Sequence, residues 1–203
     1  VGGTLMLALA PGRMGEYLGT TATRMSAEDA IYAGFADSYV PQLQWKTVIE
    51  ALETSGDVAA IDAAKIAPPG SELEVVQDQI DTLFDGETLG DVLNNLRIKD
   101  SPLAQECLKK LGRMSPLAMA STIEAIHRLR GPSLSIEKAL DLEYRFTFRA
   151  MEHGDFLEGI RAAIIDKDRS PSWQYADMNV PLATVATMLK PLGQDALTLE
   201  RTR

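Results

Sequence analysis

The segment that decides the fold class, Leu142–Trp173, reads LEYRFTFRAMEHGDFLEGIRAAIIDKDRSPSW. Apolar residues recur at helical spacing through its first half, which predicts an amphipathic helix that begins at Ser135 and ends near His153. The Asp-Phe-Leu-Glu that follows is a capping pattern and predicts a second helix over residues 155–165. Helix, not strand, is therefore the structure that this segment favours.

Similar start and stop signals extend outward through the rest of the chain. Serine or threonine precedes the apolar periodic stretches, and glycine or proline separates them. The remaining helices are expected to begin at Ser26, Ser71, Thr88, Ser101, Ser115 and Val185. The composition of residues 35–40 predicts a single strand or an extended link. Residues 42–64 are expected to form a mixture of helix and loop. We expect seven or eight short helices with almost no sheet.

Composition limits the classes of function. The chain has 203 residues, of which 45% are hydrophobic and 24% charged, as in ordinary globular proteins. The formal net charge of −9 argues against non-specific binding to nucleic acid or to an anionic membrane. Cys107 is the single cysteine, so no internal disulfide can form, which favours a reducing compartment. With only two distant histidines, His127 and His153, no zinc-ligand spacing exists.

Several residues could carry chemistry, and each also has a purely structural interpretation. The Gly2-Gly3 pair could let the backbone approach an anion or a carbonyl oxygen, or it could be a simple turn. Lys167 could bind a phosphate as a point charge, or it could be a solvated loop lysine. His127 and His153 lie at predicted helix ends, where a cation complements the helix dipole. We expect Cys107 to be a buried filler.

Acidic residues gather around three arginines in the second half of the chain. They could supply an acid–base pair, but helix caps and surface ion pairs explain them far more often. The residues concerned are Glu137, Asp141, Glu143, Glu152, Asp155 and Glu158, beside Arg145, Arg149 and Arg161. Taken alone, these patterns predict a helical domain without a visible catalytic pair.

Two segments resemble the enoyl-CoA hydratase/isomerase (crotonase) superfamily. The first, residues 1–41, has a Gly-Gly turn followed by Leu18-Gly19-Thr20, Ala27-Glu28-Asp29-Ala30, Ala33-Gly34-Phe35 and Val40-Pro41 at the family's places. The second, within residues 142–173, is most similar to the 3-hydroxyisobutyryl-CoA hydrolases. It carries Glu143-Tyr144-Arg145, Asp155-Phe156, Glu158-Gly159-Ile160-Arg161-Ala162, Asp166-Lys167-Asp168, Pro171 and Trp173. The chain departs from the commoner Leu-Val form at Phe35-Ala36-Asp37.

The resemblance implies a mainly α chain: the C-terminal helical portion of an α/β crotonase fold, whose β-sheet core lies mostly upstream of Val1. Residues 1–41 would end the crotonase core with the active-site turn and its following helices. Residues 42–203 would form a helical C-terminal region with cap and assembly helices. The family's catalytic glutamate and aspartate, and the segments that form its oxyanion hole, are expected upstream of Val1 too. No catalytic residue is therefore assigned within the chain, and the segment alone is expected to be inactive.

The implied activity is hydrolysis of a CoA thioester of a small branched 3-hydroxyacyl group, as in valine breakdown. CoA enters as part of the substrate, and no separate cofactor or metal is implied. Val1, Gly2 and Gly3 are expected to line the acyl pocket, and Lys167 to lie by the adenine and phosphates of CoA. The expected partners are the acyl-CoA substrate, the upstream segment and a second copy in a homo-oligomer, with no nucleic acid or membrane.

Two alternatives stay open at this point. One is an enoyl-CoA hydratase or isomerase of the same fold, and the other is a non-catalytic helical assembly module. The expected compartment is bacterial cytoplasm or the mitochondrial matrix.

Overall fold

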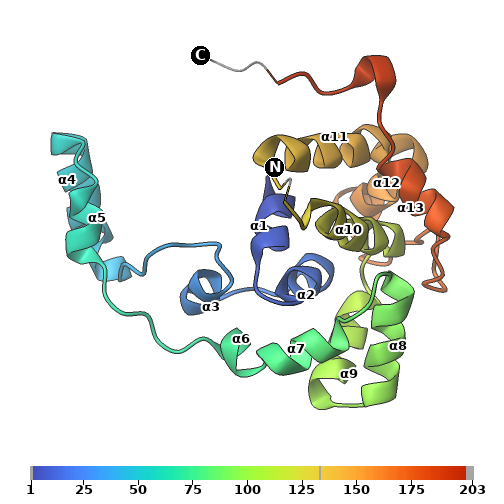
Figure 1. The fold of residues 1–203 in the computed structure, drawn as a ribbon, viewed down its shortest axis with the longest axis horizontal. Helices are drawn as coiled ribbons and strands as arrows, with labels where there is room; N and C mark the ends of the chain where they lie inside the picture. The colour runs from blue at the N-terminus through green and yellow to red at the C-terminus, as the bar shows by residue number, and fades with distance from the viewer. Residues whose placement is uncertain (1, 133, 200–203) are drawn as a thin grey trace. The chain divides into compact units, whose positions relative to one another are not determined.

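The computed structural model describes residues 2–132 and 134–199, and these residues are mainly α-helical (Figure 1). Their β-structure is limited to one isolated bridge, in which the Ile66 N–H donates to the Tyr39 carbonyl at 3.0 Å. The expected fold class is confirmed, and residues 35–40 form a link and not a strand. None of the described helices has the length and apolarity needed to cross a bilayer.

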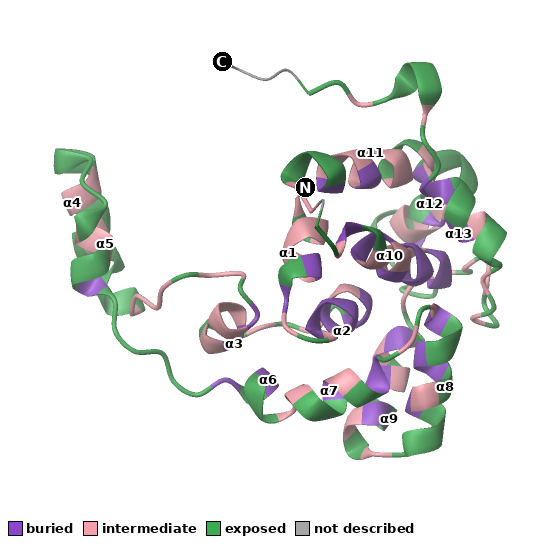
Figure 2. Cartoon of the chain, viewed as in Figure 1, coloured by how far each residue is buried: buried purple, intermediate pink, exposed green. Residues whose placement is uncertain are grey.

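The described chain divides into two compact units, one of which is Arg24–Gln77. Its helices are α3 (Ala27–Tyr32), α4 (Trp45–Ser55), α5 (Ala59–Ala64) and α6 (Glu72–Val75), with a 3-10 turn at Gln42–Gln44. Inside this unit α3 packs against α6, and α4 packs against α5. α4 has no buried residue, and Figure 2 shows it in the colours of half-buried and exposed residues.

The larger unit comprises the described residues before Arg24 and after Gln77. Its helices are α1 (Gly3–Leu9), α2 (Met14–Thr21), α7 (Gln77–Leu83, which starts at the boundary), α8 (Leu89–Lys99), α9 (Pro102–Leu111), α10 (Pro116–Leu129), α11 (Ile136–His153), α12 (Phe156–Ile160) and α13 (Leu182–Met188). A π-helical turn at Arg161–Ile165 continues α12, and a 3-10 turn occupies Gly193–Asp195. The predicted domain boundary at residue 41 separates parts of a family fold and stays a prediction.

α10 is the centre of the larger unit. It packs against α1, α2, α8, α11 and α13, and Figure 2 shows most of it buried. Its sequence is nearly free of charge until the last turns, as a helix surrounded by neighbours requires. The cluster that it forms with α1, α11 and α13 contains Ala8, Leu117, Ala125, Ile126, Leu129, Ala139, Leu142, Met188 and Leu189.

Most helix starts follow the signals in the sequence. Ser101 and Ser115 each accept a hydrogen bond from the N–H three residues on and precede a proline in the first turn. The 155–165 prediction is partly wrong. Asp155 is the N-cap residue of α12, but its carboxylate makes no capping bond and instead accepts from the Ser115 hydroxyl at 2.5 Å and the Gln174 N–H at 3.0 Å. Tertiary partners have replaced the local cap.

Candidate functional site

The Gly2-Gly3 pair forms the start of α1. Gly2 is the N-cap residue and has a left-handed backbone, with φ of +82°, which glycine adopts without strain. A Cβ added to Gly3 would meet no atom within 4 Å, so the backbone is open to close approach there. A glycine N-cap has no side chain for the free N–H groups of the first turn, and they need another acceptor.

That acceptor is the carboxylate of Glu143, which lies on α11. Its Oε2 accepts from the Gly2 N–H at 2.7 Å, and its Oε1 accepts from the Thr4 N–H at 2.9 Å and the Thr4 hydroxyl at 2.8 Å. The anion at the Gly-Gly amides is therefore a side chain of the same chain. One of the acidic residues weighed as a possible catalyst is a long-range helix cap.

The Glu143 carboxylate is held in its charged form. Its partial burial acts to raise its pKa, but the hydrogen bonds from the Thr4 and Gly2 amides and the Thr4 hydroxyl outweigh burial and lower the pKa. A negative charge at this position also complements the positive end of the α1 dipole. Glu143 is therefore an anion at neutral pH and is not suited to donate a proton.

A cavity of about 630 Å³ lies beside this cap. Thr4 and Glu143 contribute polar groups to its wall, while most of the lining is apolar and comes from α1, α10, α11 and the C-terminal segment. The apolar and small residues that line it include Leu7, Gly19 of α2, Ala118, Ala125, Leu140, Leu189 and Leu197. Its size and mostly apolar wall are typical of pockets for small organic ligands.

Lys167 lies on the exposed loop that follows the π-helical turn. Its backbone is left-handed, with φ of +57°, and Arg169 has φ of +54°. Single residues with side chains rarely adopt this conformation without support. The sequence did not indicate this strain, because nothing in the order Asp-Lys-Asp-Arg requires it.

Arg161 holds this loop in place. Its guanidinium donates to Asp166 and Asp168 at 2.7 Å each, and to the Ser170 carbonyl at 3.1 Å. It also binds both oxygens of Glu158 at 2.8 Å. The two acids on either side of Lys167 are thus paired with Arg161.

Glu158 extends the same network to the far end of the loop. Its Oε1 accepts from the Ser172 N–H at 2.6 Å, and the hydrogen bonds from Arg161 and Ser172 lower its pKa to about 2. The Trp173 indole N–H, next in the chain, donates to the Arg113 carbonyl at 3.3 Å. The loop is therefore tied at both ends.

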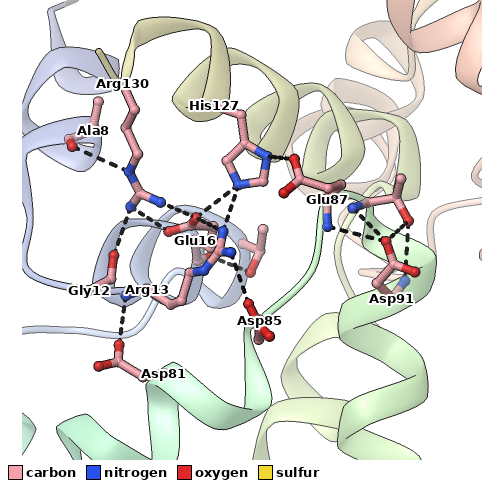
Figure 3. Close-up of polar contacts among 12 residues, drawn as sticks. Ala8, Gly12, Arg13, Glu16, Asp81, Asp85, Glu87, Asp91, His127 and Arg130 are labelled. Atoms are coloured by element: carbon pink, nitrogen blue, oxygen red, sulfur yellow. Dashed lines mark hydrogen bonds and ion pairs between the residues drawn. The ribbon is translucent and has the colours of Figure 1, made fainter. Parts of the chain in front are cut away.

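A fully buried carboxylate, Glu16 on α2, forms a second polar cluster (Figure 3). Arg130 binds it with both terminal nitrogens, at 2.5 and 2.8 Å, and also donates to the Gly12 carbonyl at 2.9 Å. Arg13 and the His127 Nε2 each lie 3.0 Å from the Glu16 Oε1. Burial acts to raise the pKa of Glu16, but hydrogen bonds from His127, Arg130 and Arg13 lower it to about 2.

This cluster joins segments that lie far apart in the sequence. Arg13 reaches Asp85 at 2.9 Å, its N–H donates to Asp81 at 2.7 Å, and the His127 Nδ1 lies 3.4 Å from Glu87. Arg130 is in turn placed by the end of α10. The α1–α2 turn, the α7–α8 link and the α10 end are thus fixed to one another.

The predicted site residues fall into two places. Gly2 and Gly3 lie at the capped start of α1, Lys167 lies on the Arg161 loop, and Val1 is outside the described residues. No hydrogen bond or ion pair found among the described residues joins the two places. Sequence reasoning missed Glu16 and Thr4. Glu16 had one usable signal, because it is the only charge in an otherwise uncharged helix, MGEYLGTT, and such a residue needs a partner.

The other candidates have structural surroundings. Cys107 is buried, and burial raises its thiol pKa to about 11, as expected for a filler and not a nucleophile. His153 ends α11 and lies 4.0 Å from Glu152. Within the described residues, no three His, Cys, Asp or Glu side chains gather closely enough to hold a metal ion.

The chain is similar to one protein family over most of its length. The sequence model described as enoyl-CoA hydratase/isomerase matches residues 1–189. The mitochondrial 3-hydroxyisobutyryl-CoA hydrolase of Rattus norvegicus is 31% identical over 189 residues, covering 88% of this chain and 49% of that protein. The Bos taurus enzyme of the same name is 32% identical over 189 residues, covering 88% and 48%. The chain thus spans about half the length of the curated relatives it matches.

Solved structures agree closely in backbone. An enoyl-CoA hydratase from Rhodobacter sphaeroides 2.4.1 superposes with a TM-score of 0.91 at 55% identity, covering 98% of this chain and 57% of that one. A carnitinyl-CoA dehydratase from Mycobacterium thermoresistibile gives 0.88 at 34% identity, covering 97% and 56%. The helices of this chain therefore follow a backbone that is also found in these two solved structures.

Proposed function

The chain belongs to the enoyl-CoA hydratase/isomerase family, and from that premise we propose that it serves hydrolysis of a CoA thioester with a small branched 3-hydroxyacyl group. 3-Hydroxyisobutyryl-CoA, an intermediate of valine breakdown, is the proposed substrate. CoA is part of that substrate, and no separate cofactor is proposed. Because the chain spans about half of its relatives, the proposal concerns the activity of the protein to which these residues contribute.

The observation that supports the hydrolase is the Arg161 loop. The last part of the motif similar to the hydrolases, residues 158–173 of the 142–173 segment, forms one unit, in which Arg161 pairs with Glu158, Asp166 and Asp168. A loop shaped in this way leaves the exposed Lys167 available to a phosphate, for which an ammonium group is a suitable point charge. We propose that Lys167 binds the phosphates of CoA, and that Gly2 and Gly3 lie beside the acyl group.

A second activity, hydration of an enoyl-CoA, is supported by one specific finding. The solved structure at 55% identity is that of an enoyl-CoA hydratase, and that identity exceeds the 31% shared with the rat hydrolase. Hydrolysis releases a free CoA thiol, whereas hydration consumes a conjugated double bond and leaves the thioester intact. The two reactions are thus separable with one preparation.

The test is a substrate panel on the purified protein to which these residues contribute, because the segment alone is expected to be inactive. We expect thiol release from 3-hydroxyisobutyryl-CoA to exceed the loss of enoyl absorbance from crotonyl-CoA in kcat/KM. The reverse order would replace the hydrolase with the hydratase, and no turnover of either would favour the assembly module. A Lys167→Ala variant is expected to raise KM with little change in kcat, because a phosphate contact far from the reacting carbonyl contributes uniform binding.

A further inference from the structure

We infer that Glu143 is a positioning residue, which from α11 fixes the turn at Gly2 and Thr4 and thereby sets the rate of the thioester reaction. The inference rests on the proposed function, because it concerns the same site. Its basis is the three hydrogen bonds, 2.7 to 2.9 Å long, that join the Glu143 carboxylate to Gly2 and Thr4.

The turn has no local means of fixing itself. Two consecutive glycines have the greatest backbone freedom of any dipeptide, and Gly2 is held at a φ of +82°. Its own N-cap position makes no side-chain capping bond. The Glu143 carboxylate accepts from the Gly2 and Thr4 amides. Its removal would leave these two amides without this partner and release the turn.

Glu143 is itself firmly supported. α11 is an 18-residue helix, and the neighbouring Ala139 and Leu142 are buried in the main core cluster with α1 and α10. The carboxylate is charged, and charge-assisted hydrogen bonds to backbone N–H groups are about twice as strong as neutral ones. The turn is thereby joined to a helix that is packed into the core cluster of the larger unit.

The position of this turn affects the reaction because the segment that precedes it is expected, from the resemblance, to carry the catalytic acids. The resemblance implies that the family's catalytic glutamate and aspartate lie upstream of Val1, in the chain that leads into the Gly-Gly pair. A displacement of about 1 Å in a reacting group costs up to about 100-fold in rate, even when its cause is remote. Loss of the Glu143 contacts should therefore lower kcat. KM should stay nearly unchanged, because the proposed CoA contact of Lys167 belongs to a different loop and is retained.

The experiment compares Glu143→Gln with Glu152→Gln in the purified protein. Glu152 lies on the same helix, but its side chain is 84% exposed and it lies outside the cap. For Glu143→Gln we expect kcat for 3-hydroxyisobutyryl-CoA to fall about 10- to 100-fold with KM within about twofold of wild type. Amide exchange at Gly2 and Thr4 should quicken about tenfold or more. Glu152→Gln should resemble wild type in all three quantities.

Three outcomes would overturn the inference. The first is an unchanged kcat in a folded Glu143→Gln protein. The second is an equal loss in Glu143→Gln and Glu152→Gln, which would indicate a general effect on α11. The third is unchanged amide exchange at Gly2 and Thr4.

Two further measurements keep the inference testable in any case. If Glu143→Gln does not fold, Thr4→Val removes one hydroxyl donor and should lower kcat about fivefold, and no decrease would contradict the inference. If wild type turns over no thioester, the proposed function fails on its own. Amide exchange at Gly2 and Thr4 then still decides whether Glu143 holds the turn.

Discussion

At the scale of single residues, the structure contains two carboxylates that are held in their charged form by partners distant in the sequence. Glu143 caps α1 from α11, and Glu16 receives Arg130, Arg13 and His127 in a buried cluster. Apart from the Arg13–Glu16 pair, which is only three residues apart, these interactions could not be predicted from the sequence, because they join positions more than 100 residues apart. Local pattern rules address neighbours within a few residues.

Replacing Glu16 should destabilise the protein strongly. Glu16→Gln leaves Arg130 and Arg13, which are mostly buried, without their shared anion, and breaking a buried ion pair in this way costs about 3 to 5 kcal/mol. Chemical denaturation would measure the free energy of unfolding. Glu106→Gln is the matched control, since it breaks an exposed pair with Lys110 that is worth less than about 1 kcal/mol. Equal effects of the two substitutions would contradict this account.

The Glu16 cluster also predicts a pH dependence. The pKa of the Glu16 carboxyl is lowered from an ordinary 4.5 to about 2, so the folded state binds a proton at Glu16 less readily than the unfolded state does. The stabilisation by Glu16 is then complete above about pH 4.5 and is lost as the pH falls toward 2. The difference in unfolding free energy between wild type and Glu16→Gln should shrink across this window. A constant difference from pH 6 to pH 2.5 would refute the assignment.

At the scale of helices, one side chain accepts hydrogen bonds at the N-termini of two helices, α3 and α6, in the Arg24–Gln77 unit. Asp29 accepts from the Ser26 N–H at 3.2 Å in the capping box of α3. Its other oxygen accepts from the Ser71 hydroxyl at 2.7 Å and the Leu73 N–H at 3.1 Å, at the start of α6. The sequence predicted both caps separately but not that they are connected.

Loss of Asp29 should therefore affect both helices at once. We expect Asp29→Ala to destabilise this unit by about 2 to 3 kcal/mol, more than the roughly 1 kcal/mol of Ser26→Ala, because two starts lose a charged acceptor. Amide exchange in α3 and α6 would measure the effect, and both helices should lose protection together. Loss confined to α3 would show that Asp29 acts only as a local cap.

The loop of Lys167 gives another element-scale prediction. Arg161→Lys keeps the charge but loses the planar fork that binds Glu158, Asp166 and Asp168 together. Amide exchange at Ser170 and Ser172 should then quicken about tenfold, because the carboxylates that accept from them are released. Arg128→Lys on α10 is the control, and an equal change there would argue against a special role for Arg161.

The sequence specified element starts better than element lengths. Ser26, Thr88, Ser101, Ser115 and Ser135 all proved to be caps, because capping is a local interaction between residues three apart. The described residues hold thirteen α-helices and not seven or eight, because α1 and α2 begin without a side-chain cap, and the spans predicted from Ser71 and over residues 42–64 each contain two helices. The helix expected over 155–165 changes to π-helix at Arg161, a shift that periodicity does not reveal.

At the scale of the whole molecule, the two units differ in how well they are packed. In the larger unit, five helices pack around α10. In the other unit, α4 has no buried residue and the stretch around Pro68-Pro69-Gly70 is exposed. Regions with few buried contacts open at low free energy. Exposed backbone before such a stretch is a ready site for proteolysis.

Limited trypsin digestion should therefore cut first after Lys65. Lys65 is exposed and precedes that stretch, whereas Lys167, although exposed, lies in the loop bound by Arg161. Peptide mass analysis of early time points would identify the first site. Cleavage after Lys167 before Lys65 would show that the Arg161 network does not restrain its loop.

The Glu16 cluster also has a consequence for how the sequence changes over generations. A single substitution at position 16 leaves two cations without their shared anion, and loss of Arg130 takes the two-pronged partner away from a buried anion, so each step alone carries a large cost. Positions 16, 127 and 130 are therefore expected to vary as a set. Among relatives, an apolar residue at 16 should accompany an uncharged one at 130, and lineages that cross between the two states should do so through compensating pairs.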